Sequence, residues 1–101
     1  MLKIALIDDK DYGIKHIKQL HEYEEIELIY FESFEEFKKS DKCFDIIYLD
    51  YYLDKDGITG DTILQYVKTR CNKLIGFSSV KRCNEELKKA GATHTVNKKH
   101  L

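Results

Sequence analysis

Long apolar runs are absent from this sequence, and so is a large excess of either charge. No apolar stretch approaches the roughly 20 residues that a membrane-spanning helix needs, and the N-terminus has no signal-peptide pattern. The 17 basic and 18 acidic residues give a formal net charge of −1. This balance provides no electrostatic reason to expect nucleic acid as a direct partner. We therefore expect a cytoplasmic protein that binds neither membranes nor nucleic acid directly.

Cysteine is scarce and proline is missing altogether. The three cysteines, Cys43, Cys71 and Cys83, form neither a CxxC pair nor a zinc-binding pattern, which favours reduced structural thiols. The 101 residues are 43% hydrophobic and 35% charged, which is ordinary for a globular protein and sufficient for one small domain. Because repeats, low-complexity tracts and linkers are also absent, residues 1–101 are predicted to form a single domain.

Apolar segments with strand character alternate with segments that have helical periodicity. Ser33 is predicted to cap the second helix, with Glu36 completing a capping box, and Gly91 to end the fourth. Asp61 or Thr62 is expected to cap the third helix, after a loop at 51–60. The predicted strands are 2–7, 26–31, 44–49, 74–77 and 93–96, and the predicted helices are about 12–23, a segment after Ser33, a segment after 61 or 62, and about 81–90.

This alternation argues for an α/β fold in which helices cover both faces of a five-stranded parallel sheet. In such folds ligands bind beyond the C-terminal ends of the strands, where the strand order reverses. Several acidic and polar residues fall directly after predicted strands. They are Asp8, Asp9, Asp50, Ser78 and a lysine just past Val96.

Three carboxylates at neighbouring strand ends would repel one another unless a cation or a proton neutralised them. An oxygen-rich site of this kind suits Mg2+, which would orient an incoming phosphoryl group toward one carboxylate. A nearby lysine supplies positive charge for phosphate oxygens, and a serine hydroxyl supplies a hydrogen bond. Phosphoryl transfer needs little more than this, because positioning and charge neutralisation provide most of the catalysis.

On these residues the sequence resembles the receiver domain of bacterial two-component response regulators. The matching positions are the Asp8-Asp9 pair, Asp50 in Ile-Ile-Tyr-Leu-Asp, Ser78 after Leu-Ile-Gly-Phe, and Lys98 in Gly-Ala-Thr-His-Thr-Val-Asn-Lys. Each follows its own strand, and together they span residues 2–98. The resemblance implies a flavodoxin-like doubly wound sheet with strand order 2-1-3-4-5.

The resemblance also implies a role for each matching residue. Asp50 would accept a phosphoryl group from a histidine kinase or a phosphotransfer protein, and the domain would catalyse its own phosphorylation rather than act as a conventional enzyme. Ser78 would donate a hydrogen bond to the phosphoryl oxygen, and Lys98 would pair with the phosphate. The metal ligands implied for Mg2+ are Asp9, Asp8 directly or through water, Asp50, and the backbone carbonyl of Tyr52.

The chain departs from the family pattern in features that concern output. Lys99 stands where the family usually has a proline, and the small Thr95 stands where it usually has a switch aromatic. The usual fifth helix is expected to be missing or truncated. Because no DNA-binding or catalytic output domain is expected in these residues, a phosphorylation signal would pass through a protein partner or a homodimer. Because Tyr52 and Val80 are bulky and cannot orient water, we predict slow autodephosphorylation.

Some alternatives remain open at this point. The domain could be a degenerate receiver that acts as a phosphorylation-independent interaction module. An error of one residue in register would exchange Lys98 and Lys99, and Ser78 or Ser79 could merely cap the following helix. The four histidines lack metal-ligand spacing and are predicted to lie at the surface or its boundary; they are His16, His21, His94 and His100.

Overall fold

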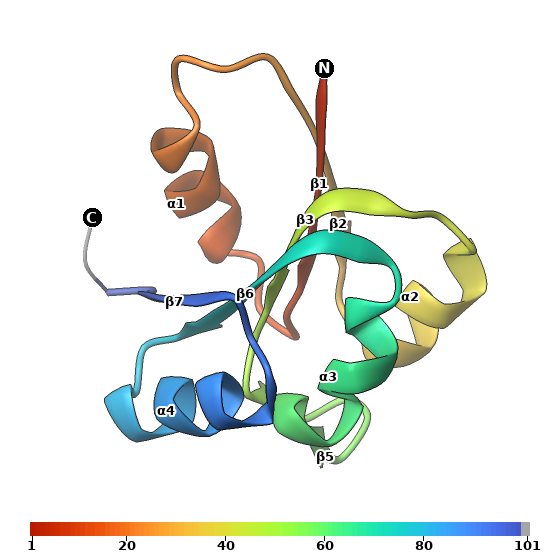
Figure 1. The fold of residues 1–101 in the computed structure, drawn as a ribbon, viewed down its shortest axis with the longest axis vertical. Coiled ribbons are helices and arrows are strands. Elements are labelled where there is room, and N and C mark those ends of the chain that lie inside the picture. Colours follow the sequence, from red (N-terminus) through yellow and green to blue (C-terminus); the bar gives the residue numbers. More distant parts are fainter. Residues whose placement is uncertain (100–101) are drawn as a thin grey trace.

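Five parallel strands form the main sheet of the computed structural model, which describes residues 1–99 (Figure 1). The strand order is β2-β1-β3-β6-β7, which confirms the predicted order. Three of the predicted strands have the predicted bounds, the fourth begins three residues earlier and ends one later, and the last is shifted by one residue. The strands are β1 (Leu2–Ile7), β2 (Ile26–Phe31), β3 (Phe44–Leu49), β6 (Cys71–Ser78) and β7 (His94–Asn97).

The central strands are apolar because helices cover both faces of the sheet. In β1, the four residues from Ile4 to Ile7 are all buried, and β3 pairs with them from Ile4↔Ile46 to Ile7↔Leu49. The edge strands β2 and β7 are only partly buried. The extension of β6 was not predicted, because its first three residues are polar or half-buried and have no strand pattern.

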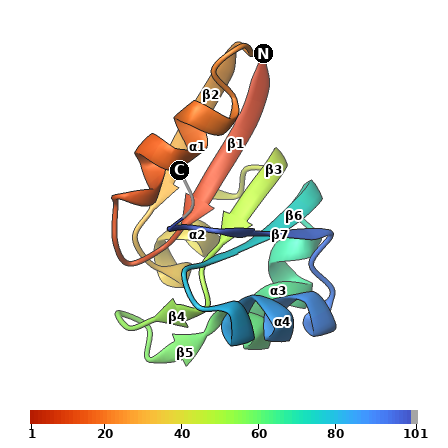
Figure 2. The same ribbon diagram turned by 90° about the vertical axis from the view of Figure 1, so that its left-hand side faces the viewer.

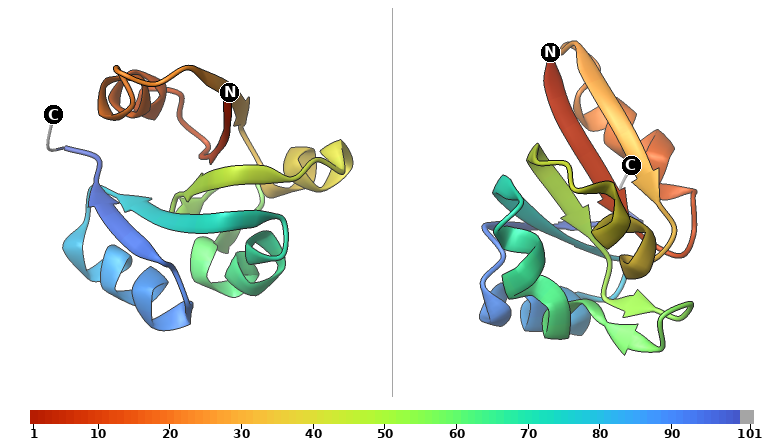
Figure 3. Two further views of the ribbon diagram at one scale, coloured as in Figure 1. Left: turned by 45° about the horizontal axis from the view of Figure 1, so that its top comes forward. Right: turned by 90° about the vertical axis from the view of Figure 1, so that its right-hand side faces the viewer.

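Four helices are formed within residues 1–99, and they lie on both faces of the sheet (Figure 3). Helix α1 (Gly13–Leu20) packs Ile17 into one core, whereas the other helices pack Phe37, Leu64 and Leu87 into the core on the opposite face. The latter are α2 (Phe34–Ser40), α3 (Gly60–Lys68) and α4 (Lys81–Ala90). None of the described helices has the length and apolar character needed to cross a membrane.

The predicted loop at 51–60 contains a small antiparallel hairpin below the end of β3 (Figure 2). Its strands are β4 (Tyr52–Leu53) and β5 (Ile58–Thr59), and Gly57 makes its turn with φ of +68°. The prediction that Asp61 or Thr62 caps the next helix was wrong. Helix α3 begins earlier, at Gly60, because the hairpin carries the chain directly into it.

Two other helix ends follow the prediction. The Ser33 hydroxyl accepts a hydrogen bond from the Glu36 amide at 3.1 Å, and Gly91 ends α4 with φ of +122°. The Asp56 carboxylate adds a second cap for α2, because it accepts hydrogen bonds from the Phe34 and Glu35 amides. The hairpin is thereby tied to the start of α2, where a negative charge is favourable.

No helix follows β7 within residues 1–99, in line with the expected absence of the usual fifth helix from this part of the chain. One face of the sheet is therefore covered by α1 alone among the described helices. His100 and Leu101, the last two residues, lie outside the described residues.

Candidate functional site

Strands β1 and β3 end at the same edge of the sheet (Figure 2), and three carboxylates follow these two strand ends. Asp8 and Asp9 follow β1, Asp50 follows β3, and one oxygen from each lies within 4.8 Å of the others. Asp8 and Asp50 are buried, and Asp9 is half-buried. Backbone hydrogen bonds hold two of them in place, because the Asp8 amide donates to the Phe31 carbonyl and the Asp50 amide to the Ile7 carbonyl.

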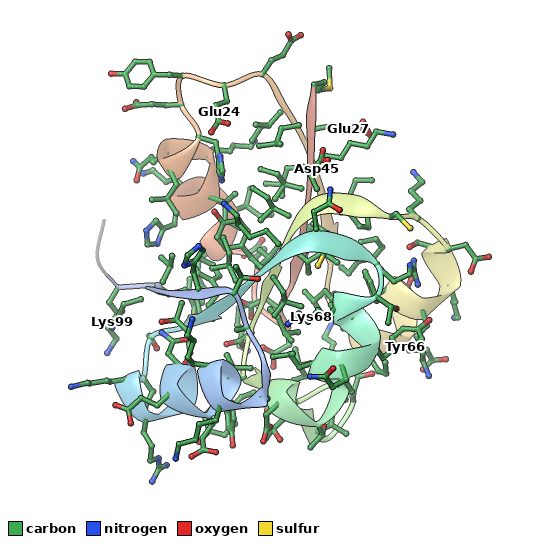
Figure 4. The ribbon with its side chains drawn as sticks, in the orientation of Figure 1. Glu24, Glu27, Asp45, Tyr66, Lys68 and Lys99 are labelled. Atoms are coloured by element: carbon green, nitrogen blue, oxygen red, sulfur yellow. The ribbon has the colours of Figure 1, made fainter. Side chains whose placement is uncertain are left out.

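Lys98 completes this cluster from the end of β7. Its Nζ lies 2.8 Å from Asp8 Oδ2 and 3.1 Å from Asp50 Oδ1, and its side chain is only 5% exposed. The neighbouring Lys99 is exposed and projects from the periphery of the molecule (Figure 4). The structure therefore places Lys98, rather than Lys99, against the carboxylate that follows β3.

The ionisation of the cluster reflects its burial and its surplus of acids. Burial and the negative charge of Asp8 raise the pKa of Asp50 to about 7, although Lys98 opposes this shift. Burial would lower the pKa of Lys98, but the charges of Asp50 and Asp8 outweigh this effect and leave it raised. Lys98 is therefore a firmly charged ammonium, and the three acids still exceed it by two negative charges when all are ionised.

This donor set fits a hard divalent cation such as Mg2+. Mg2+ prefers oxygen ligands, and carboxylate oxygens of Asp8, Asp9 and Asp50 lie within 4.8 Å of one another, so these three side chains would hold the ion. A divalent cation would also remove the excess negative charge. The Tyr52 backbone carbonyl stays a predicted ligand, on the first residue of β4.

Ser78 is placed at the C-terminal end of β6, two residues beyond the pairing of Leu49 with Gly76. Its side chain is turned back on its own loop, since Oγ accepts a hydrogen bond from the Val80 amide at 3.1 Å. The alternative that Ser78 or Ser79 caps α4 was wrong: Val80 is the N-cap, and it makes no side-chain capping bond.

Asn84 in α4 holds the Ser78 backbone from both sides, which sequence reasoning missed. Its Oδ1 accepts from the Ser78 amide at 2.9 Å, and its Nδ2 donates to the carbonyls of Ser78 and Val96 at 3.0 and 3.2 Å. The side chain thus ties the ends of β6 and β7 together. The only available signal was an asparagine one turn into a polar helix, directly after the strand-end serines.

Gly60 lies directly under Asp50, and this close approach was also not predicted. A Cβ atom at Gly60 would stand 2.2 Å from the Asp50 carbonyl oxygen, far inside van der Waals contact. The Gly60 amide donates to the Tyr51 carbonyl. The start of α3 therefore packs on the backbone that carries the Asp50 carboxylate, and only glycine leaves room for it.

The prediction that all histidines lie at the surface or its boundary was wrong for His16. This residue is 3% exposed, and its Nδ1 lies 3.0 Å from the backbone carbonyl oxygen of Lys98. His21 is half-buried between Glu24 and the Tyr48 hydroxyl, and His94 is exposed. Burial of His16 follows from its place on the inner face of α1, next to Ile17.

Comparison with known proteins identifies the fold. No protein-family model matches the sequence, and no curated protein matches it. Solved structures do resemble it. The BeF3-activated DrrB receiver domain is 21% identical with a TM-score of 0.76, over 100% of this chain and 87% of that one. The Mg2+-BeF complex of the response regulator TrrA from Thermotoga maritima is 22% identical with a TM-score of 0.75, over 96% and 86% of the two chains.

A third structure is a response regulator from Burkholderia pseudomallei with a phosphorylated aspartic acid, a calcium ion and citrate. It is 15% identical with a TM-score of 0.79, and the match covers 100% of this chain and 62% of that chain. At these identities the likeness establishes the fold. The chain has the flavodoxin-like fold of response-regulator receiver domains.

Proposed function

We propose that this chain is a phosphoacceptor receiver domain of a two-component phosphorelay. In this role Asp50 accepts a phosphoryl group from a histidine kinase or a phosphotransfer protein, with Mg2+, in the cytoplasm. The observation that carries the proposal is the contact of the Lys98 ammonium with both Asp8 and Asp50 inside the carboxylate cluster. A buried ammonium and a predicted metal site beside a buried acid would supply the positioning and charge neutralisation on which phosphoryl transfer depends.

Asp50 must be ionised to attack phosphorus. Without a metal its pKa lies near 7, so a fraction of the carboxyl groups is protonated at neutral pH. The Lys98 ammonium favours the ionised form. When bound by Asp8, Asp9, Asp50 and the Tyr52 carbonyl, Mg2+ would supply further positive charge for the carboxylate and for the phosphoryl oxygens.

Transfer then proceeds by attack of an Asp50 carboxylate oxygen on phosphorus, opposite the leaving group of the donor. The new P–O bond makes an acyl phosphate, and the bond from phosphorus to the donor breaks, with its electron pair staying on the departing donor atom. Lys98 already lies 3.1 Å from Asp50 Oδ1, so it needs only a small shift to pair with a phosphoryl oxygen. Ser78 would rotate its hydroxyl from the Val80 amide to donate to another oxygen.

Similar structures support this role. The DrrB receiver domain is described as BeF3-activated, TrrA as bound to Mg2+-BeF, and the Burkholderia protein as phosphorylated on aspartic acid. Those ligands belong to those proteins. Their relevance here is that this chain has the same fold and carries an acidic cluster at the C-terminal ends of β1 and β3.

A second candidate is a degenerate receiver that binds its partner regardless of phosphorylation. The feature in its favour is Thr95, which is exposed on β7 and carries no ring that could change its packing when Asp50 is modified. Titration with Mg2+ separates the two candidates. A phosphoacceptor should give saturable changes in the amide resonances of Asp9 and Asp50, whereas a purely structural module should give none.

The test is incubation with Mg2+ and acetyl phosphate, followed by intact-mass spectrometry. We expect a gain of one phosphoryl mass, which chelation of Mg2+ prevents and which Asp50→Asn abolishes. Asp54→Asn is the matched control, because the Asp54 side chain is exposed in the adjacent hairpin and is not one of the three clustered carboxylates. Absence of an adduct with every phosphodonor, or an undiminished adduct in Asp50→Asn, would refute the proposal.

A further inference from the structure

His16 is a buried histidine with one polar partner in the part of the chain that the structure describes. Its Nδ1 lies 3.0 Å from the carbonyl oxygen of Lys98, a residue 82 positions away in the sequence. A carbonyl oxygen only accepts hydrogen bonds, so Nδ1 must carry the proton. The imidazole also packs on Phe77, with ring centroids 5.5 Å apart.

This hydrogen bond lies one residue beyond the end of β7. Strand β7 ends at Asn97, and its last pair is Ser78↔Asn97. Beyond that pair, the Lys98 amide donates to the Ser78 carbonyl at 3.2 Å and the Lys98 carbonyl accepts from His16. The peptide groups on both sides of the Lys98 Cα atom are thereby fixed, one by β6 and the other by α1.

Gly13 explains how α1 comes close enough for this contact. A Cβ atom at Gly13 would stand 2.7 Å from Cε2 of Phe77, so only glycine allows the first turn to approach that buried ring. His16 lies three residues later and therefore on the same face of the helix. The first turn of α1 packs on Phe77, and the next residue on that face reaches the Lys98 carbonyl.

We infer that His16 is a positioning residue for Lys98: its Nδ1–H holds the Lys98 peptide so that Nζ reaches Asp8 and Asp50. The lysine side chain is long and flexible, and fixing its backbone reduces the conformational freedom lost when its ammonium pairs with a phosphoryl oxygen. This inference rests on the proposed function for its effect on catalysis. The placement of Lys98 itself does not depend on it.

Two substitutions of similar size separate the hydrogen bond from packing. Asparagine at position 16 has an amide nitrogen near the position of Nδ1 and retains a donor, whereas leucine has the same shape without one. Both lose the ring contact with Phe77 equally. His94→Leu is the control for the substitution itself, because the His94 side chain is exposed on β7.

The first measurement is the rate of phosphorylation by acetyl phosphate at saturating Mg2+. We expect His16→Leu to lower this rate about fivefold, the change that corresponds to one ordinary hydrogen bond. We expect His16→Asn to stay within about twofold of the wild type, and His94→Leu to be unchanged. If His16→Leu does not fold, His16→Phe takes its place, because it keeps a ring against Phe77 but has no donor.

The second measurement is the 15N resonance of the Lys98 ammonium, which needs no phosphorylation. Buried and paired with Asp8 and Asp50, this group should exchange its protons slowly and give a resolved signal in the wild type and in His16→Asn. His16→Leu should broaden the signal or remove it. If the wild type takes up no phosphoryl group, the proposed function fails, and this signal alone decides whether His16 holds the lysine.

The inference is overturned if His16→Leu keeps both the wild-type rate and the Lys98 signal. It is equally overturned if His16→Asn is impaired as much as His16→Leu, because the donor would then not be what matters. A positioning role is supported if His16→Leu lowers the phosphorylation rate and weakens the Lys98 signal while His16→Asn retains both.

Discussion

Replacement of Asp50 by asparagine should stabilise the metal-free protein at alkaline pH, although it removes the proposed phosphoacceptor. The carboxylate of Asp50 is buried together with that of Asp8, and an oxygen of Asp9 lies within 4.8 Å. Asparagine has nearly the same shape and carries no charge. The substitution therefore removes a buried charge without opening a cavity.

The size of this effect follows from three opposing contributions. At 4.8 Å each of the two other acids repels Asp50 by about 3 kcal/mol in an effective dielectric of about 20. Lys98 attracts it across 3.1 Å by about 5 kcal/mol under the same conditions. Because these charge terms nearly cancel, the cost of burying the carboxylate decides the sign, in agreement with the raised pKa of Asp50.

A pKa of about 7 in place of 3.8 corresponds to a penalty of about 4 kcal/mol on the ionised group. This penalty already includes the attraction of Lys98, so we expect a net gain of up to about 4 kcal/mol in unfolding free energy at pH 8. The pKa of Asp50 is higher in the folded chain than in the unfolded chain. Wild-type stability should therefore fall as the pH rises from 3.8 to about 7, and the advantage of Asp50→Asn should grow over the same range.

Urea unfolding in the presence of a chelator, at about pH 5 and about pH 8, measures this difference. Asp54→Asn should change neither value appreciably, because its side chain is exposed. Addition of Mg2+ should stabilise the wild type more than Asp50→Asn, since the variant has lost one ligand. A wild type as stable as Asp50→Asn at pH 8 without metal would refute the reasoning about buried charge.

Three further predictions concern the surroundings of Asp50. Gly60→Ala should destabilise the protein by at least about 2 kcal/mol in urea unfolding, because the alanine Cβ would meet the Asp50 carbonyl. This loss is expected although alanine is normally a better helix former than glycine. Asn84→Ala should cost about 2 to 3 kcal/mol in the same assay, since it leaves the buried Ser78 amide without a partner; no loss would contradict its role as a tie between strands. The phosphorylated form should decay slowly, because Tyr52 and Val80, two residues after Asp50 and Ser78, are bulky and cannot orient water; a lifetime of seconds, followed by mass spectrometry, would contradict this.

The strands of the main sheet could be predicted from the sequence, because the buried strands are nearly continuous apolar runs and the segments between them have helical periodicity. The strand order was predicted from the resemblance to receiver domains. The sequence was less informative where local preference and tertiary packing disagree. The first three residues of β6 are polar or half-buried, and only their pairing beside Phe44 makes them strand. The hairpin formed by β4 and β5 has two residues in each strand, too few for an alternating pattern to be visible.

In the candidate site, too, some features could be predicted from the sequence and others depend on tertiary packing. Asp8, Asp9, Asp50 and Lys98 follow strands directly, so their meeting at one edge could be predicted from topology. The residues that support the site could not be predicted from the sequence. His16, Asn84 and Gly60 act through contacts with backbone atoms of other segments, and no spacing in the sequence indicates which carbonyl or amide a residue will meet.

The most direct test of the account is a crystal structure of the protein with Mg2+ and beryllofluoride, which mimics a phosphoryl group on aspartate. We predict beryllofluoride attached to Asp50, Lys98 Nζ and the Ser78 hydroxyl on its fluorine atoms, and Mg2+ between Asp9 and Asp50 near the Tyr52 carbonyl. Beryllofluoride absent from Asp50 at saturating concentration would contradict the proposed site. So would a complex that contains it in which Lys98 still pairs only with the carboxylates of Asp8 and Asp50.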